Sequence, residues 1–212
     1  MDELVSTLRR LCDGEAECNV QVLKEAIEAL TRAAESREFH ASGHGEMVGR
    51  YTEMIGRALA LPADEIADLA FAGRVHDVGK IFVPERIVSK TGTLTDEEYA
   101  VMKTHARIGA EIVETIPSSI QLQKAIEHHH EAFDGSGYPN GLRGEEIPLW
   151  ARIVGLADAL VNMTTDRSFA PAKTSDQAMA EIEKMSGTRY DGMLVRVLMR
   201  QLKTGTAPSL GD

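Results

Sequence analysis

The histidines of this chain gather at a few points of the sequence. Seven are present in 212 residues, at positions 40, 44, 76, 105, 128, 129 and 130. A single His on an apolar helix face is more often a hydrogen-bonded core residue than a ligand. Here each His lies at a predicted helix end or on a helix with apolar core positions, and the residues cluster with carboxylates. This arrangement indicates metal binding.

Asp158 gives the sharpest signal from the residues alone. It interrupts the apolar run from Ala151 to Val161, which predicts a buried helix. An unpaired buried carboxylate is costly, and coordination of a metal ion is one way to compensate it. The alternative is a buried ion pair with Arg152 or Arg167.

The pair His76-Asp77 follows an apolar helical stretch and precedes Val78-Gly79-Lys80. Adjacent residues point in different directions on a regular helix, so both side chains reach one site only where the helix ends or distorts. Asp77 could then bridge two ions through its two oxygens, while His76 binds one of them. Lys80 is placed to hold a phosphoryl oxygen as a compact positive charge.

His40 and His44 are four residues apart, so they share one helix face if the helix extends back to His40. His105 is followed by Gly109, which leaves room for close approach of ions or another helix. His and carboxylate ligands without Cys suit divalent iron, manganese, zinc, cobalt or nickel. Two such ions can activate a bridging hydroxide and neutralise a phosphoryl transition state. The residues therefore favour metal-assisted hydrolysis of a phosphate ester.

The elements that must position these residues are helices. Apolar residues recur every three or four positions and period-two alternation is almost absent, so we expect an all-α fold. Between Asp134 and Pro148 five Gly or Pro residues predict a long ordered loop, and such loops are usually functional. Helices are expected at about 21–36, 43–60, from 63 onward, from a capping box at 95–98 to a stop at 117, from 118 or 119 toward 128, and at 148–165, 175–185 and 191–203.

Composition limits the partners and the location. The chain has 23 Lys plus Arg against 33 Asp plus Glu, a formal net charge of −10, which argues against binding a long nucleic acid. No run approaches the ~18 apolar residues of a membrane span, and no leader pattern opens the chain, so we expect a cytoplasmic protein. Cys12 and Cys18 are expected to be free structural thiols.

From about Leu23 to Leu202 the chain resembles the HD-GYP family, the bacterial HD phosphohydrolases that hydrolyse cyclic dinucleotides, chiefly cyclic di-GMP. The resemblance rests on motifs in a fixed order: His44 with Val48 and Tyr51, Val75-His76-Asp77-Val78-Gly79-Lys80, His105 with Gly109, His129-His130-Glu131, Asp134-Gly135-Ser136-Gly137-Tyr138-Pro139, Ala157-Asp158, and Thr165-Asp166-Arg167.

The resemblance implies an HD-domain bundle of about seven core helices plus N-terminal helices, with two divalent metal ions inside, iron or manganese first among the candidates. The implied ligands are His44, His76, Asp77 and Asp158 for one ion, and His105, His129 and His130 for a second, with Asp77 as the bridge. Asp77 and Lys80 are the implied catalytic residues. The implied organisation is an N-terminal helical extension at 1–36, the HD-GYP domain at 37–203 and a flexible tail at 204–212.

The implied substrate contacts are Lys80, Tyr138, Arg167 and Phe169. The loop Gly137-Tyr138-Pro139 borders the cleft in the family, where it also serves scaffolding and contacts with protein partners. For Tyr138 the alternative is therefore simple loop packing.

Two stretches depart from the family pattern. Members with three metals use an acidic residue before the first His and a second Asp after the last ligand; here His40 and Val161 stand at those places, which leaves His40 as the candidate ligand of a third ion. After Arg167 the family commonly has further basic residues, whereas this chain continues Ser168-Phe169-Ala170-Pro171. Lys173 is the candidate replacement for the lost positive charge.

We therefore predict a cyclic di-GMP phosphodiesterase in which a metal-bridging hydroxide attacks phosphorus and yields linear pGpG, or GMP if cleavage continues. One alternative is a degenerate HD-GYP module that binds nucleotide or a protein partner without turnover. Another is a hydrolase of a different cyclic dinucleotide or of a nucleotide phosphate ester. The sequence predicts no particular oligomeric state.

Overall fold

The computed structural model describes residues 1–10, 20–38, 42–166, 171–204 and 208. In this part of the chain every regular element is a helix, and the only bridge outside the helices joins Ser186 and Tyr190. The order is α1 (Asp2–Arg10), α2 (Val20–Glu35), α3 (His44–Ala58), α4 (Ala63–Val75), the 3-10 helix η1 (Val78–Phe82), α5 (Glu85–Val88), α6 (Asp96–Val113), α7 (Ile120–His128), the 3-10 helix η2 (Gly144–Glu146), α8 (Leu149–Thr164), α9 (Ser175–Lys184) and α10 (Gly192–Lys203). The predicted all-α fold is confirmed.

Local chemistry explains where the helices begin. Thr95 caps α6 in a complete capping box with Glu98, as the sequence predicts. Thr174 and Gln177 form a second capping box at the start of α9. Pro148 precedes the first residue of α8, a position where a missing N–H costs nothing.

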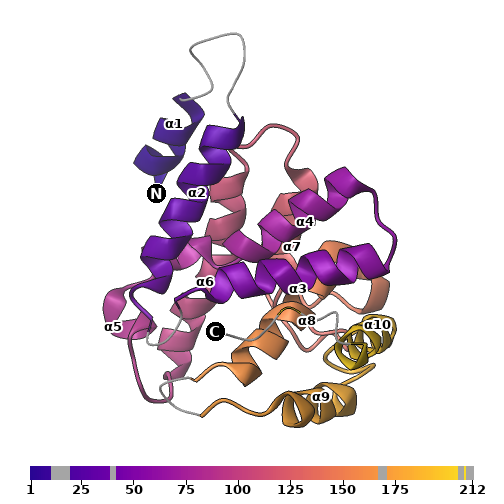
Figure 1. The fold of residues 1–212 in the computed structure, drawn as a ribbon. Coiled ribbons are helices and arrows are strands. Elements are labelled where there is room, and N and C mark those ends of the chain that lie inside the picture. Colours follow the sequence, from indigo (N-terminus) through magenta and orange to yellow (C-terminus); the bar gives the residue numbers. More distant parts are fainter. Residues whose placement is uncertain (11–19, 39–41, 167–170, 205–207, 209–212) are drawn as a thin grey trace.

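The helices pack around a core that lies directly beneath the histidines. The helix α3 runs along α4, α8 packs on both α3 and α7, and α6 packs on η1 and α7 (Figure 1). Tyr51, Phe71, Ile126 and Ile153 are completely or almost completely buried where these helices meet. The helices that carry the histidines are thus fixed to one another by apolar burial.

Several details differ from the predicted elements. The helix that carries His44 begins at that residue, because Gly43 has a left-handed backbone with φ of 79°, so this helix does not extend back to His40. The short helix α1 lies within the N-terminal helical extension that the resemblance implies, although the sequence predicted no bounds for it. In the predicted loop from Asp134 to Pro148, the structure has only the single turn of η2.

Some predictions lie outside the described residues. They concern the thiols of Cys12 and Cys18, the third-metal ligand His40, and most of the tail after Thr204. The domain boundaries at 36 and 203 stay a prediction, as does the cytoplasmic location. Among the described helices none combines the length and apolar character that a membrane crossing requires.

Candidate metal centre

The structure brings the predicted metal ligands into two groups that share one residue. In the first group, ligand atoms of His44, His76 and Asp77 all lie within 4.8 Å of one another. In the second, the same holds for the side chains of Asp77, His105, His129 and His130. Asp77 therefore stands between the two groups, as a bridging ligand must.

The two oxygens of Asp77 face different partners. The atom Oδ1 lies 3.3 Å from Nε2 of His105, and Oδ2 lies 3.3 Å from Nε2 of His76. This is possible because α4 ends at Val75 and η1 begins at Val78, so the chain changes direction at the His76-Asp77 pair. The predicted break in the helix at this pair is confirmed.

A backbone carbonyl three residues earlier orients each of three imidazoles. Nδ1 of His76 lies 2.8 Å from the carbonyl oxygen of Gly73. Nδ1 of His105 lies 2.6 Å from that of Met102, and Nδ1 of His129 lies 2.7 Å from that of Ile126. A carbonyl oxygen only accepts, so Nδ1 carries a proton and Nε2 is the nitrogen that faces the centre. Such partners fix the tautomer and the ring direction of metal-binding His residues.

Asp158 joins the first group from α8. Its Oδ1 lies 3.0 Å from Nε2 of His44 and 3.5 Å from Nε2 of His76, and it accepts a 2.8 Å hydrogen bond from Asn162 one turn later. The alternative pairing with Arg152 is wrong, because Nη1 of Arg152 binds Asp191 at 2.5 Å instead. Pairing with Arg167 falls on a residue outside the described ones.

The electrostatics of the cluster favour ionised carboxylates. Burial tends to raise the pKa of Asp77, but the charges of Lys80 and His76 outweigh it and hold the pKa well below its usual value. For Asp158 burial is likewise outweighed by contacts with His44 and His76. Both side chains are therefore anionic near neutral pH, the form that binds a cation.

The histidines of the cluster differ in the direction in which their pKa is shifted. Burial lowers the pKa of His129 well below its usual value, with the neighbouring His130 acting in the same direction, and burial lowers the pKa of His130 to about 3. Both are thus neutral and ready to act as ligands. His76 behaves differently: burial tends to lower its pKa, but Asp77 and Asp158 outweigh burial and raise it. A divalent ion held there would compete with that proton.

The donor atoms fit divalent metal ions. The Nε2 atoms of His44, His76 and His129 are buried and make no hydrogen bond with the described part of the chain, although carboxylate oxygens lie close to two of them. A buried polar atom without a partner is costly, and coordination satisfies it. Nε2 of His130 and Nε2 of His105 also converge to 3.2 Å, as two ligands of one ion do.

Lys80 lies beside the carboxylate that joins the two groups. Its Nζ is 2.7 Å from Oδ2 of Asp77 and also donates to both oxygens of Glu38, at 2.9 and 3.2 Å. Arg37 holds the turn that carries it by donating to the carbonyl oxygens of Lys80, Ile81 and Val83. The sequence predicts the position of Lys80 but not its partnership with Glu38.

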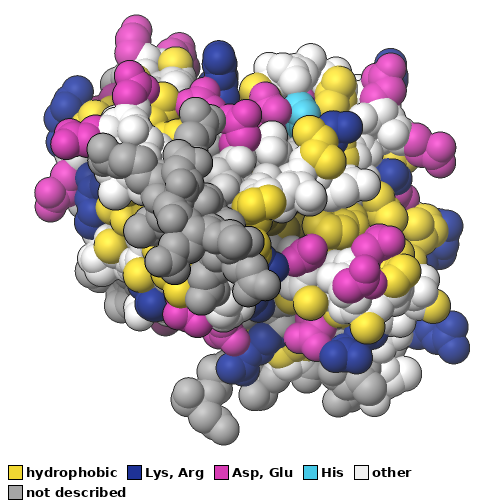
Figure 2. Space-filling view, turned by 90° about the horizontal axis from the view of Figure 1, so that it is seen from above, with side chains coloured by type: hydrophobic (Ala, Val, Ile, Leu, Met, Phe, Trp, Pro, Cys, Tyr) yellow, Lys and Arg dark blue, Asp and Glu magenta, His cyan; other side chains and the backbone are white. Residues whose placement is uncertain are grey.

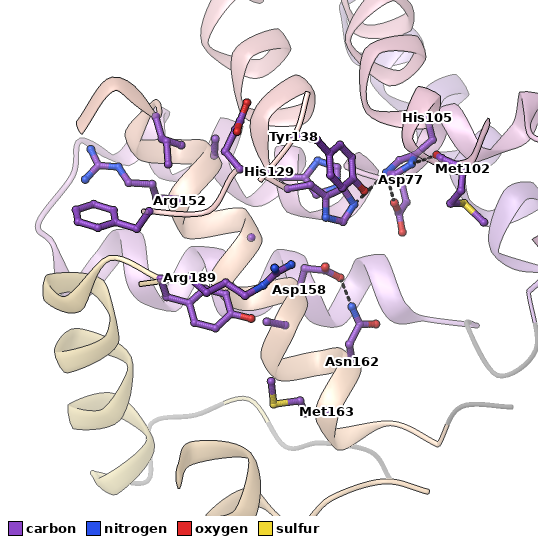
Figure 3. Close-up of a pocket in the computed structure, with 18 of the residues that line it drawn as sticks. Asp77, Met102, His105, His129, Tyr138, Arg152, Asp158, Asn162, Met163 and Arg189 are labelled. Atoms are coloured by element: carbon purple, nitrogen blue, oxygen red, sulfur yellow. Dashed lines mark hydrogen bonds and ion pairs between the residues drawn. The ribbon is translucent and has the colours of Figure 1, made fainter. Parts of the chain in front are cut away.

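A cavity of about 660 Å³ opens above the centre, within the range of about 300–1,000 Å³ for small-ligand sites. Asp77, His105, His129 and Asp158 lie on its wall together with Tyr138 (Figure 3). The outer surface is different: on the face in Figure 2, acidic and basic side chains alternate without a continuous basic area.

The loop after His130 is ordered by its own acidic residues. Glu131, whose side chain is fully buried, accepts hydrogen bonds from the N–H groups of Asn140 and Leu142, at 2.7 and 3.2 Å. The ring of Tyr138 stacks on His130, with centroids 4.8 Å apart and planes at 29°, while also lining the cavity. Tyr138 therefore packs in the loop and faces the cavity, so the two alternatives for this residue are compatible.

Other predicted residues cannot be placed, and several cavity residues were not predicted. Arg167 and Phe169, the predicted substrate contacts, lie outside the described residues, as does His40. Lys173 lines the cavity, but its ammonium group pairs with Glu181. Sequence reasoning missed Glu38, Tyr99, Asn162 and Arg189. Only Asn162 left a local signal, since it lies four residues after Asp158 on one helix face.

Glu35 positions the first ligand without touching the centre. Its carboxylate accepts hydrogen bonds from the N–H groups of Gly43 and Gly45, at 3.2 and 2.7 Å, at the N-terminus of α3. We expect Glu35→Gln to lower metal affinity about 10- to 100-fold, because an amide offers one acceptor and turns its NH₂ toward the other N–H donor. Metal titration measures this; Glu25→Gln, exposed on the same helix, is the control, and equal affinity in both variants would contradict the role.

The chain is similar in sequence to known proteins over most of its length. The HD-domain family model matches residues 28–194. A "Cyclic di-GMP phosphodiesterase" of Thermotoga maritima is 37% identical over 181 residues, which are 84% of this chain and 49% of that protein. The "Cyclic di-GMP phosphodiesterase response regulator RpfG" of Xanthomonas campestris is 37% identical over 84% of this chain and 47% of its own length.

Further similarity extends to proteins named for a different dinucleotide. The "3'3'-cGAMP-specific phosphodiesterase 2" of Vibrio cholerae is 34% identical over 83% of this chain and 34% of that protein. The crystal structure of V-cGAP3 from V. cholerae superposes with a TM-score of 0.71 at 23% identity, covering 87% of this chain and 49% of that one, which supports the fold. The chain spans about half or less of the length of these relatives.

Proposed function

Because the chain belongs to the HD-domain family, and within it to the HD-GYP branch, we propose that it is a metal-dependent phosphodiesterase that opens cyclic di-GMP. The observation that carries the proposal is the pair of ligand groups that share Asp77 on the wall of a cavity, with Lys80 beside them. A module that had lost catalysis would have no need of both groups.

We propose His44, His76, Asp77 and Asp158 as the ligands of one ion, and Asp77, His105, His129 and His130 as those of another, with iron or manganese as the metals. When bound, such ions polarise phosphoryl oxygens and lower the pKa of water. The donor set, nitrogen and carboxylate oxygen without sulfur, supports this choice.

The chain's own residues bind and orient the substrate around that centre. Lys80 would attract an oxygen of the scissile phosphate, and Glu38 keeps its ammonium group from folding entirely onto Asp77. The ring of Tyr138, stacked on His130, offers an apolar surface on the cavity wall for a sugar or base. Contact of the loop 137–139 with a protein partner stays a prediction.

Support for a cyclic dinucleotide comes from the relatives and from the size of the cavity. Relatives named for cyclic di-GMP and for 3'3'-cGAMP match more than four fifths of this chain, so both nucleotides belong in a substrate test. Product identity, pGpG or GMP, is part of the same test.

Metal binding is expected to stabilise the fold. At free metal 100 times its dissociation constant, each site contributes about 2.7 kcal/mol. For a chain of this size, occupation of one site raises the melting temperature by about 5–10 °C. Scanning calorimetry on chelated and reloaded protein, with metal counted by elemental analysis, measures both quantities. An unchanged melting temperature with two ions bound would contradict our assignment of buried ligands.

Activity is tested by anaerobic reconstitution with iron(II) or manganese(II), followed by chromatography of cyclic di-GMP and 3'3'-cGAMP reactions. The proposal predicts a linear product from cyclic di-GMP with loaded enzyme and none after chelation. Product from 3'3'-cGAMP alone would change the substrate and keep the chemistry. Stoichiometric metal without product from either nucleotide would favour the binding module.

A further inference from the structure

Among the described residues, four Lys and Arg side chains line the cavity, and three of them are held by carboxylates. Lys80 contacts Asp77 and Glu38, Arg152 binds Asp191, and Lys173 pairs with Glu181. Arg189 lines the same cavity, and no carboxylate among the described residues lies within 4.0 Å of its guanidinium group. Its charge is therefore available to a ligand.

The backbone of Arg189 is fixed to the loop that follows the last histidine. Its N–H donates to the carbonyl of Met185 at 3.0 Å, and its own carbonyl accepts from the N–H of Phe133 at 3.1 Å. Beside it, the carbonyl of Thr188 accepts from the N–H of Asp134 at 2.7 Å. The turn before α10 and the loop after α7 thus form one frame, so the position of Arg189 is set relative to the metal centre.

The side chain extends from this frame into the cavity. In Figure 3 its guanidinium group points toward Asp158, whereas Arg152 lies at the far side. Burial raises the pKa of Tyr138, and the charge of Arg189 acts in the opposite direction. The guanidinium group is therefore close enough to Tyr138 to interact with it electrostatically. Arg189 is exposed to solvent, and its side chain interacts with the hydroxyl group of Tyr190, not with a carboxylate, so an anion need not displace a charged partner.

A cyclic dinucleotide presents two phosphodiesters in one ring. When one of them lies against Lys80 and the ligand groups, the other lies elsewhere in the same cavity, where Arg152 and Lys173 are already held by carboxylates. Without a cation nearby, this second phosphate would lose hydration of its charge without compensation. A guanidinium group matches a phosphate with two parallel N–H donors, and it keeps its charge at every working pH.

We infer that Arg189 binds the second, uncleaved phosphodiester of the cyclic dinucleotide; this assignment rests on the proposed function. Arg189 would then fix the register of the ring in the cavity, while the reacting phosphate stays with the metal centre. The contact is made before the reaction and kept during it, so its loss weakens binding more than turnover.

The variant Arg189→Gln tests this, with Arg196→Gln as the matched control, since Arg196 is exposed on α10 and does not line the cavity. We expect the KM for cyclic di-GMP to rise by about 10- to 100-fold in Arg189→Gln, as loss of a charge-assisted contact implies, with kcat within about threefold. Arg189→Lys should recover part of the loss. Hydrolysis of bis(p-nitrophenyl) phosphate, which has a single phosphodiester, should be unchanged.

Further substrates separate the other roles. The rise in KM caused by Arg189→Gln should be the same for cyclic di-GMP and for its 7-deazaguanine analogue. If KM rises for cyclic di-GMP but not for the analogue, Arg189 contacts the guanine edge instead of the phosphate, and the inference is overturned. An unchanged KM, or an equal loss on bis(p-nitrophenyl) phosphate, would overturn it as well.

Failure of the proposed function gives a different result. If loaded wild-type protein hydrolyses no cyclic dinucleotide, calorimetric titration with cyclic di-GMP still decides the role of Arg189. Binding that Arg189→Gln weakens and Arg196→Gln does not would support the contact without catalysis. Absence of binding by wild-type protein would overturn both proposals.

Discussion

Asp77→Asn is expected to lower kcat for cyclic di-GMP by at least about 10³-fold, which corresponds to about 4 kcal/mol of transition-state stabilisation. The reason is that Asp77 alone belongs to both ligand groups, and each of its oxygens faces a different His. The amide keeps the shape of the side chain but replaces one anionic oxygen by a donor. Metal content should fall from two ions per chain to one or fewer.

The measurement combines steady-state kinetics with elemental analysis of the reconstituted protein. Asp64→Asn, an exposed change in the first turn of α4, is the control for loss of one acidic charge and should keep both ions and full activity. Asp77→Asn protein that retains two ions and wild-type turnover would remove Asp77 from the proposed role. Circular dichroism at the assay temperature verifies that the variant is folded.

The arrangement of the candidate ligands was predictable because their signals are local. Burying an ionisable side chain without a partner is costly. A His-Asp pair at the end of an apolar helix and a carboxylate inside an apolar run both place such side chains where burial is expected, and both patterns can be recognised without knowing the fold. In the structure Asp77 lies at the junction of α4 and η1, and Asp158 lies inside α8. Their use as metal ligands stays a proposal that the metal measurements address.

The charges around the cavity could not be predicted, since their partners are distant in sequence. Arg152 pairs with Asp191, 39 residues away, and not with Asp158, although the latter lies closer along the chain. Lys80 meets Glu38 across 42 residues. Amphipathic periodicity fixes which face of a helix is buried, but not which element that face meets.

The sequence likewise could not identify which cation replaces the basic residues missing after Arg167. The sequence makes Lys173 the candidate because it follows the altered stretch after Arg167, yet its partner Glu181 lies in the second turn of α9. Arg189 reaches the cavity from the turn before α10, which hydrogen bonds attach to the loop after His130. Nothing in the local sequence around Arg189 distinguishes it from the exposed Arg196.

Near the centre, Gly79→Ala should destabilise the fold more than the addition of a methyl group at any other described glycine. A Cβ at position 79 would lie 2.0 Å from the carbonyl oxygen of His105 and 2.6 Å from the backbone nitrogen of Gly109. Both atoms belong to the backbone of α6, so no side chain can rotate away, and η1 must move from α6. We expect a loss of about 3 kcal/mol or more, which lowers the melting temperature by about 6–12 °C.

The control is Gly92→Ala, where a Cβ meets no atom within 4 Å, and its melting temperature should stay unchanged or rise slightly. Because the clash lies between two backbones, the loss in Gly79→Ala should persist in protein freed of metal by chelation. Since the same movement separates Asp77 from His105, metal affinity should fall as well. A loss of stability confined to the metal-loaded protein would instead mean that the turn relaxes, and that Gly79 serves metal binding alone.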